Sequence, residues 1–189
     1  MKAIRITILA AVLALDLKVQ GDGLININFT DGGSNVGSGQ IDVVNGYAVS
    51  GYFDVTAGLA AGNYTLYTAG GTGTFQNLIT SPSGRFIYDN AVYVPPATNP
   101  QYPATNPILD NGGLLFTDAS NNEVNLWGNA DGSYTFDAFI NNAYLDPTGI
   151  IGTSTITPTP EPSSLALIAL MLVPAGILFR PNPKLQLPK

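Results

Sequence analysis

The sequence feature that most restricts the fold is a strict alternation of apolar and polar residues in short segments. At residues 24–30 (LININFT), Ile25, Ile27 and Phe29 alternate with asparagines. Successive side chains of an extended chain point to opposite faces, whereas a helix needs apolar residues three or four positions apart. This alternation predicts a β-strand with one buried face and one polar face.

Similar segments, rich in β-branched and aromatic residues, recur along the middle of the chain between Gly, Asn and Pro. Further strands are predicted at residues 47–56, 63–68, 73–80, 84–94, 113–117, 123–127, 133–140 and 149–157. No segment of helical period separates them. The chain is therefore predicted to be all-β, a single antiparallel β-sandwich or meander barrel of about seven to nine strands.

Residues 113–140 give the clearest connectivity. Two turns, at residues 118–122 (DASNN) and 129–132 (NADG), contain the Asn, Asp and Gly residues that tolerate positive φ. They separate three short apolar segments, so a three-stranded antiparallel meander is predicted here.

Composition excludes several kinds of chemistry. The 189-residue chain has no Cys and no His, so it has no disulfide, no thiolate or imidazole metal ligand and no Cys or His nucleophile. Only 11% of the residues are charged, and the 21 Gly and 14 Pro favour turns, which argues against a helical bundle. We expect no cofactor and no metal site.

The charges are unevenly distributed along the chain. Residues 22–157 contain ten Asp and one Glu against a single base, Arg85, for a net charge of −10. Nucleic-acid phosphates attract Lys and Arg, so nucleic acid is excluded as a partner. The other six cationic residues lie near the two ends, which indicates that the ends serve a purpose other than folding.

Residues 1–21 have the order of a secretory signal peptide. Lys2 and Arg5 come first, then an apolar run over residues 6–15, then a short polar stretch. The run of about ten residues is too short for a helix that crosses the bilayer, which needs about 20. Cleavage of this signal helix is predicted before Asp22, and Val12-Leu13-Ala14 offers a second cleavage site. The alternative is a buried first helix or strand of the fold.

The C-terminal part contains an uncharged apolar run at residues 165–179, followed by Arg180 and Lys184. As a transmembrane helix this run would be about 22 Å long, shorter than the roughly 30 Å hydrocarbon core, and Pro174 would kink it. A weakly held membrane helix is predicted, with its basic end in the cytoplasm because cations beside a span stay on that side.

Pro160, Glu161 and Pro162, followed by two serines, the apolar run and the basic end, resemble the PEP-CTERM sorting signal over residues 158–189. The resemblance implies export through the general secretion machinery of an exopolysaccharide-producing Gram-negative bacterium. It also implies transient anchoring in the inner membrane and cleavage near the motif by exosortase. The released domain, residues 22–157, would then reach the cell surface or the extracellular matrix.

The sorting motif itself has a clear physical character. Two prolines hold Glu161 in an extended segment without internal hydrogen bonds, a form that a protease or transpeptidase can bind as a strand. Glu161 is therefore predicted as the specificity contact. A plain C-terminal anchor without processing is the alternative. Residues 108–117 and 123–128 also resemble a sequence segment shared by exported proteins with this tag. This similarity does not indicate an activity.

A short duplication interrupts the strand pattern. Residues 96–100 (PATNP) recur as residues 103–107, and residues 95–107 contain five prolines. Proline cannot donate to a β-ladder, so an extended surface loop is predicted. The loop either presents Tyr102 for recognition or is a repeat expansion without a role.

The acidic residues offer two kinds of candidate site. Asp137 and Asp146 are candidates for the carboxylate pair of a glycoside hydrolase, although a polar strand face and an Asp-Pro turn explain both positions without catalysis. Asp118, Ser120 and Asn122 alternate as calcium ligands do. An EF-hand loop would need Gly at the position of Glu123 and Glu at the position of Asn129, so this segment is not an EF-hand. The remaining alternatives are an irregular calcium site and a hairpin turn.

Trp127, the single Trp, is the candidate sugar contact. Apolar sugar faces stack on flat aromatic rings, and Trp127 ends a predicted strand directly before Gly128. It lies either at a sheet rim, where it could contact a sugar, or in the core. The glycine-rich stretches at residues 37–39 and 70–73 lack the Lys and the helix start of a phosphate loop.

The sequence as a whole predicts a non-enzymatic, exported cell-surface or matrix protein. Its expected partners are the secretion machinery, exosortase, the inner membrane and exopolysaccharide. A carbohydrate-binding module is the second hypothesis, and a polysaccharide hydrolase is the third.

Overall fold

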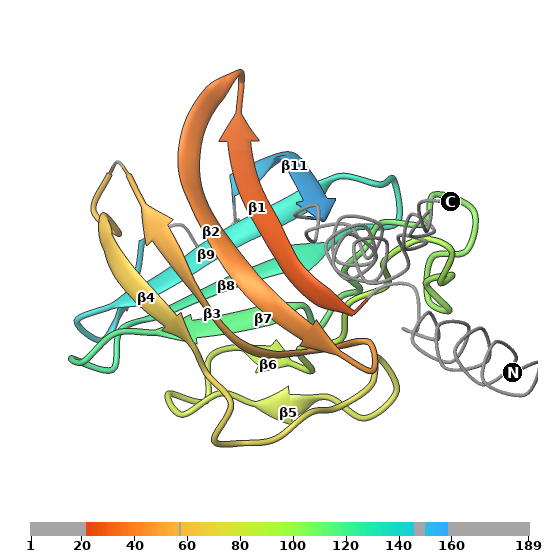
Figure 1. Ribbon diagram of the computed structural model, residues 1–189. Coiled ribbons are helices and arrows are strands. Elements are labelled where there is room, and N and C mark those ends of the chain that lie inside the picture. The colour runs from red at the N-terminus through yellow and green to blue at the C-terminus, as the bar shows by residue number, and fades with distance from the viewer. Residues whose placement is uncertain (1–21, 57, 146–149, 159–189) are drawn as a thin grey trace, which may run out of the picture. The chain divides into compact units, whose positions relative to one another are not determined.

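Eight antiparallel strands form a barrel-like sheet in the computed structural model, which describes residues 22–56, 58–145 and 150–158 (Figure 1). The eight are β1 (Gly23–Asp31), β2 (Ser34–Val44), β3 (Tyr47–Val55), β4 (Gly62–Leu66), β7 (Leu114–Thr117), β8 (Glu123–Gly128), β9 (Tyr134–Ile140) and β11 (Ile150–Pro158). They neighbour one another in the order β9, β11, β1, β2, β3, β4, β7, β8, and the pairing of β8 with β9 completes the ring. Three two-residue strands are added: β5 (Ile79–Thr80) pairs with β6 (Ile87–Tyr88), and β10 (Ala143–Tyr144) pairs with β9.

The all-β prediction is confirmed, and the sheet is barrel-like. The described residues contain no helix, and therefore none long and apolar enough to cross a membrane. The predicted signal helix at residues 1–21 and membrane helix at residues 165–179 lie outside the described residues.

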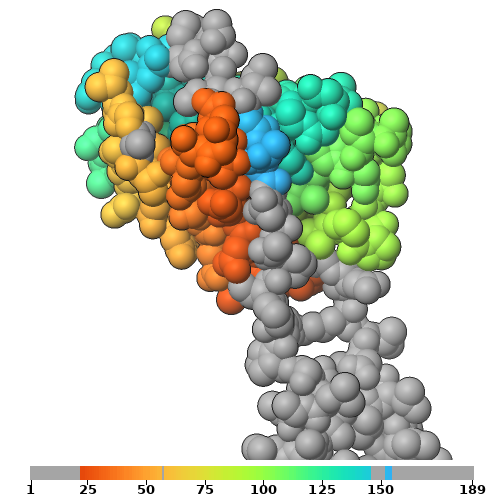
Figure 2. Space-filling view, turned by 90° about the horizontal axis from the view of Figure 1, so that it is seen from above, coloured from red at the N-terminus to blue at the C-terminus, as the bar shows by residue number. Residues whose placement is uncertain are grey.

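The first strand has the two faces that its alternation predicts. Ile25, Ile27 and Phe29 are buried, and the asparagines between them are exposed. β1 pairs with β2 on one side and with β11 on the other. In the space-filling view, the blue residues of β11 lie beside the orange-red residues of β1 (Figure 2). Strands from the two ends of the domain are thus neighbours in the sheet.

The predicted meander is also confirmed. β7 pairs with β8, opposing Leu114 to Leu126, and β8 pairs with β9, opposing Leu126 to Phe136. The two turns contain the positive φ angles expected of them, 60° at Asn121 and 87° at Gly132.

One long strand was not predicted. β2 has eleven residues, yet its sequence, SNVGSGQIDVV, includes glycines at its middle. At Gly39 a Cβ atom would overlap the backbone carbonyl of Tyr52 on β3, so the close approach of the two strands requires glycine there. The same glycines remove the side chains from which an alternation would be recognised.

The strands predicted at residues 73–80 and 84–94 are mostly wrong. Only β5 and β6, two residues each, form there, and the rest is irregular. These residues belong to an excursion between β4 and β7, residues 67–113, which we call the covering segment. Its apolar side chains pack on another surface instead of alternating across a sheet, so its β-like composition does not produce long strands.

Two apolar clusters result from this arrangement. Inside the barrel, Phe53 packs on Phe116 and Phe136, with ring centroids 5.6 and 6.0 Å apart. Outside it, Leu115 of β7 and Phe139 of β9 join Phe86 and Tyr88 of the covering segment in a second cluster. The covering segment therefore lies on the outer face of β7, β8 and β9.

The duplicated PATNP stretch forms no strand, as predicted, but part of it is buried. Asn99 is fully buried, and its amide donates to the carbonyls of Pro107 and Leu109 at 2.8 and 2.9 Å. The Asn99 N–H donates to Oδ1 of Asn106, the equivalent asparagine of the second copy, at 2.7 Å. Tyr102 is half-buried. The two copies thus fold on each other.

Candidate functional site

The outward-facing side chains of β8 and β9 form a polar and aromatic surface. Val124 and Leu126 point into the barrel, so the residues that alternate with them point outward. Across the two strands the outward residues oppose each other as the pairs Glu123 with Phe139, Asn125 with Asp137, and Trp127 with Thr135. Two pockets lie on this surface, bordered by the covering segment and by the residues around β10.

The first of these, which we call the tryptophan hollow, has a volume of about 300 Å³. It is lined by Arg85, Phe86, Ile87, Asn111, Asn125, Trp127, Asp137 and Tyr144. Trp127 is half-buried and belongs to neither apolar cluster, so its ring lies outside the core. The core position, the alternative that a lone Trp in a β domain usually takes, is therefore not the one observed.

Two buried amide oxygens in the tryptophan hollow have no partner. Oδ1 of Asn111 and Oδ1 of Asn125 accept no hydrogen bond from the described part of the chain. Asn125 is 2% exposed, and its amide nitrogen donates to the carbonyl of Ile87 at 3.0 Å, which fixes the direction of the oxygen. Since a buried acceptor without a partner costs free energy, a donor from outside the described residues would be favoured at these oxygens.

The tryptophan hollow also contains two charged groups and one hydroxyl group. Asp137 is 7% exposed and accepts a hydrogen bond from the Ala138 N–H. Burial and the nearby negative charge of Asp137 raise the pKa of Tyr144, so its hydroxyl stays protonated at neutral pH and donates to the Arg85 carbonyl at 2.8 Å. The Arg85 side chain is exposed, and it is the only base in residues 22–157.

An aromatic ridge separates this hollow from the second. Arg85 lies over the Phe139 ring, with its guanidinium carbon 5.6 Å from the centroid. The ring of Tyr144 packs edge-on against Phe139 and Phe86, at 5.5 and 5.7 Å between centroids. The ridge is thus built from the covering segment, β9 and β10.

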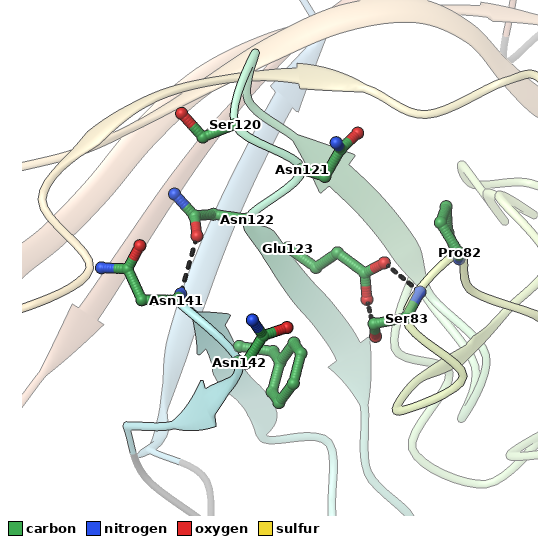
Figure 3. Close-up of a pocket in the computed structure, with 9 residues that line it drawn as sticks. Pro82, Ser83, Ser120, Asn121, Asn122, Glu123, Asn141 and Asn142 are labelled. Carbon is green, nitrogen blue, oxygen red and sulfur yellow. Dashed lines mark hydrogen bonds between the residues drawn. The ribbon is translucent and has the colours of Figure 1, made fainter.

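The second, which we call the asparagine hollow, has a volume of about 550 Å³. It is lined by Pro82, Ser83, Ser120, Asn121, Asn122, Glu123, Phe139, Asn141 and Asn142 (Figure 3). Glu123 is 1% exposed, and Figure 3 shows its carboxylate directed at Ser83. That carboxylate accepts hydrogen bonds from Ser81 Oγ at 2.7 Å, Ser83 N at 2.7 Å and Ser83 Oγ at 2.6 Å.

The turn before β8 and the turn between β9 and β10 meet at the asparagine hollow and are joined by a hydrogen bond. The Asn141 N–H donates to Oδ1 of Asn122 at 2.9 Å, and the Asn122 amide donates to Asp118 at 2.7 Å. Asn121, Asn141 and Asn142 all have positive φ, between 51° and 64°. Asparagine tolerates this conformation better than most residues, which explains the clustering of asparagines here.

The alternating residues Asp118, Ser120 and Asn122 form a hairpin turn. Oδ1 of Asp118 accepts hydrogen bonds from the N–H groups of Ser120 and Asn122, and Oδ2 accepts one from the Asn122 amide. Burial raises the pKa of Asp118, but these hydrogen bonds outweigh burial and hold the pKa below its usual value. Among the described residues, no group of three or more acids could hold a metal ion.

The other predicted site residues are distributed as follows. Asp137 lies in the tryptophan hollow, whereas Asp146, its proposed catalytic partner, lies outside the described residues. The sorting motif Pro160, Glu161 and Pro162 and the basic residues Arg180 and Lys184 also lie outside them.

A buried pair of aspartates was not predicted. Asp89 and Asp110 are both fully buried, and Tyr93 donates to Asp110 at 3.0 Å. Burial raises the pKa of Asp89 to about 7, and the charge of Asp110 and a hydrogen bond with it add to the effect. Both aspartates stand next to Asn in the sequence, as turn residues often do, and nothing in that pattern indicates that they meet.

Comparison with known proteins found no match among protein-family models, curated proteins or solved structures.

Proposed function

We propose that this chain is an exported, non-catalytic protein that associates with extracellular polysaccharide through the tryptophan hollow. The observation that supports it best is the pair of buried amide oxygens, on Asn111 and Asn125, that lack a donor beside the half-buried ring of Trp127. Aromatic rings next to a few fixed polar groups are the usual composition of a saccharide-binding site.

Each group in the hollow has a role that suits a sugar ring. The indole of Trp127 offers a flat apolar surface to the C–H face of the sugar. The oxygens of Asn111 and Asn125 accept hydrogen bonds from two hydroxyls, and Asp137 accepts more strongly because it is charged. Arg85, exposed at the edge, donates to ring or hydroxyl oxygens.

Delivery to the cell surface is a separate part of the proposal and rests on the sequence. The signal peptide predicted at residues 1–21 and the PEP-CTERM resemblance at residues 158–189 support secretion followed by exosortase cleavage near Glu161. Glu161→Ala is expected to accumulate an uncleaved, membrane-held form, observed by intact mass of the extracellular and membrane fractions. Extracellular protein of the parent's mass and amount would contradict the sorting assignment.

The geometry gives hydrolysis less support than binding. Glu123 lies diagonal to Asp137 across β8 and β9, a spacing of roughly 7–8 Å between Cα atoms for such positions in an antiparallel pair. However, the carboxylate of Glu123 already accepts three hydrogen bonds from Ser81 and Ser83. We therefore assign it a structural role and propose no catalytic pair.

Binding can be tested with the purified full chain in detergent and the exopolysaccharide of the producing organism. Trp127→Ala is expected to weaken binding at least tenfold, which corresponds to about 1.4 kcal/mol. The matched control is Tyr52→Ala, which removes an aromatic ring that is 47% exposed on β3, away from both hollows. Equal binding by the parent and Trp127→Ala would refute the proposal, and release of new reducing ends from the polymer would refute its non-catalytic part.

A further inference from the structure

We infer that the asparagine hollow is a second sugar-binding site, so that the ligand is a neutral polysaccharide chain that occupies both hollows. This inference rests on the proposed function of the tryptophan hollow and adds the class of ligand to it.

Position is the first support. Glu123 in the asparagine hollow and Trp127 in the tryptophan hollow both face outward from β8, four residues apart. At roughly 3.4 Å per residue, their Cα atoms are about 14 Å apart, so a chain of several sugar rings would extend from one hollow to the other. Between them lie Phe139, which is buried, and the ring of Tyr144, which is 36% exposed and on which the apolar face of a sugar can stack.

The unused polar groups of the asparagine hollow are the second support. The side chains of Ser120, Asn121, Asn141 and Asn142 are exposed and make no hydrogen bond to another described residue. Each amide offers two donors and an acceptor, and each hydroxyl offers both, the same combination that sugar hydroxyls need. Because the two turns are joined by the Asn141–Asn122 hydrogen bond, the backbone that carries these side chains is held in place before a ligand arrives.

Charge decides between neutral and acidic chains. Residues 22–157 have a net charge of −10, so an anionic polymer is repelled by the domain as a whole. Asp137 lies in the tryptophan hollow and Glu123 in the asparagine hollow, against the single base Arg85. A neutral, hydroxyl-rich chain avoids this repulsion and uses the carboxylate of Asp137 as an acceptor.

The test measures affinity against chain length. Neutral oligosaccharides, prepared by partial acid hydrolysis of the producing organism's exopolysaccharide and separated by size, are titrated into the full chain in detergent. The variant is Asn121→Gly combined with Asn142→Gly. Glycine removes both amides yet adopts positive φ without strain, so the turns are retained. Asn45→Gly is the matched control, since Asn45 has a φ of 53° and lines neither hollow.

In the parent and in Asn45→Gly, affinity is expected to rise with length until the chain spans both hollows. In the double variant this gain is expected to fall by about thirtyfold, the effect of two lost hydrogen bonds of about 1 kcal/mol each, while mono- and disaccharide binding is unchanged. An undiminished gain in the double variant refutes the second site and leaves the proposed function standing. Weakening of all saccharide binding by at least tenfold in Trp127→Ala alone is the signature of the proposed function.

Three other outcomes would also overturn the inference. Tighter binding of a uronic-acid-rich fraction than of the neutral fraction refutes the neutral ligand. Calcium binding that the double variant abolishes, with saccharide binding unchanged, assigns the asparagine hollow to a cation. Absence of binding to any fraction by the parent refutes both the inference and the proposed function.

Discussion

The inside of the barrel and the layer beneath the covering segment both exclude solvent, but different chemistry stabilises them. Apolar and aromatic side chains fill the inside. The second layer contains the buried polar residues of the described part of the chain, which come from the covering segment or from the outward faces of β8 and β9: Ser81, Asp89, Asn90, Asn99, Asp110, Glu123, Asn125, Thr135 and Asp137. Burial of apolar area is nondirectional, whereas buried polar groups need specific partners. The second layer is therefore the part expected to respond to pH and to ligands.

The largest effect is expected inside the barrel. Phe53 is fully buried and packs on two phenylalanines, so Phe53→Ala leaves a cavity and is expected to lower the free energy of unfolding by about 3–5 kcal/mol. Urea unfolding measures this. Val49→Ala, at a side chain 44% exposed on the same strand, is the control and is expected to change stability by less than about 0.5 kcal/mol. A loss below about 1 kcal/mol for Phe53→Ala would show that the inside is not the main source of stability.

The second layer should make stability depend on pH through Asp89. Its pKa is about 7 in the folded protein against an ordinary value of 3.8, so between these two pH values the folded state holds a proton that the unfolded state has lost. Stability therefore falls as pH rises through this window, by as much as about 4 kcal/mol for a shift of about three units.

Asp89→Asn is expected to remove most of this dependence. Asparagine keeps the acceptor for the Ala91 N–H and supplies a permanent donor toward Asp110, so no proton is needed. Denaturant unfolding at pH 5 and pH 8 should show the parent losing stability between them and the variant changing little, with the variant more stable at pH 8. A parent whose stability rises over that interval would contradict the raised pKa of Asp89.

An intermediate effect is expected at Glu123, which joins the covering segment to β8. Glu123→Gln replaces a carboxylate that accepts from Ser81 and Ser83, so we expect a loss of about 2 kcal/mol, typical of a hydrogen-bonded charged group. Hydrogen exchange should also accelerate at the Ser83 and Phe86 amides while β1 stays protected. Asp31→Asn, at the exposed end of β1, is the control. Uniform acceleration over both layers would show that they unfold as one unit.

The smallest effect is expected at the rim. Tyr144→Phe removes only the hydrogen bond to the Arg85 carbonyl and keeps the ring contacts, so about 0.5–1 kcal/mol is expected. Thermal unfolding of the variant and parent measures it. A loss as large as that of Phe53→Ala would mean that the ridge is a principal support of the covering segment.

Local sequence pattern was sufficient for the elements whose two faces differ in polarity. The faces of β1 and the β7–β8–β9 meander follow from alternation and turn residues, because both signals act between residues close in the chain. β2 lacked that signal since its glycines carry no side chain, and the covering segment gave a misleading one. The site was predictable only at Trp127 and Asp137, and the sequence alone assigned them no common hollow.

The sequence therefore established that this domain is all-β and that it lacks thiol and imidazole chemistry, and its charged ends led to the prediction of export and sorting signals. Which strands meet to close the barrel, and which outward residues are buried, depended on contacts between distant segments. Arg85 and Asn111 come from the covering segment, Asn125 from β8 and Tyr144 from β10, yet they line one hollow. An alternating pattern specifies that Asn125 faces away from the barrel interior. It does not specify whether water or another segment lies there, because burial is a property of the whole fold.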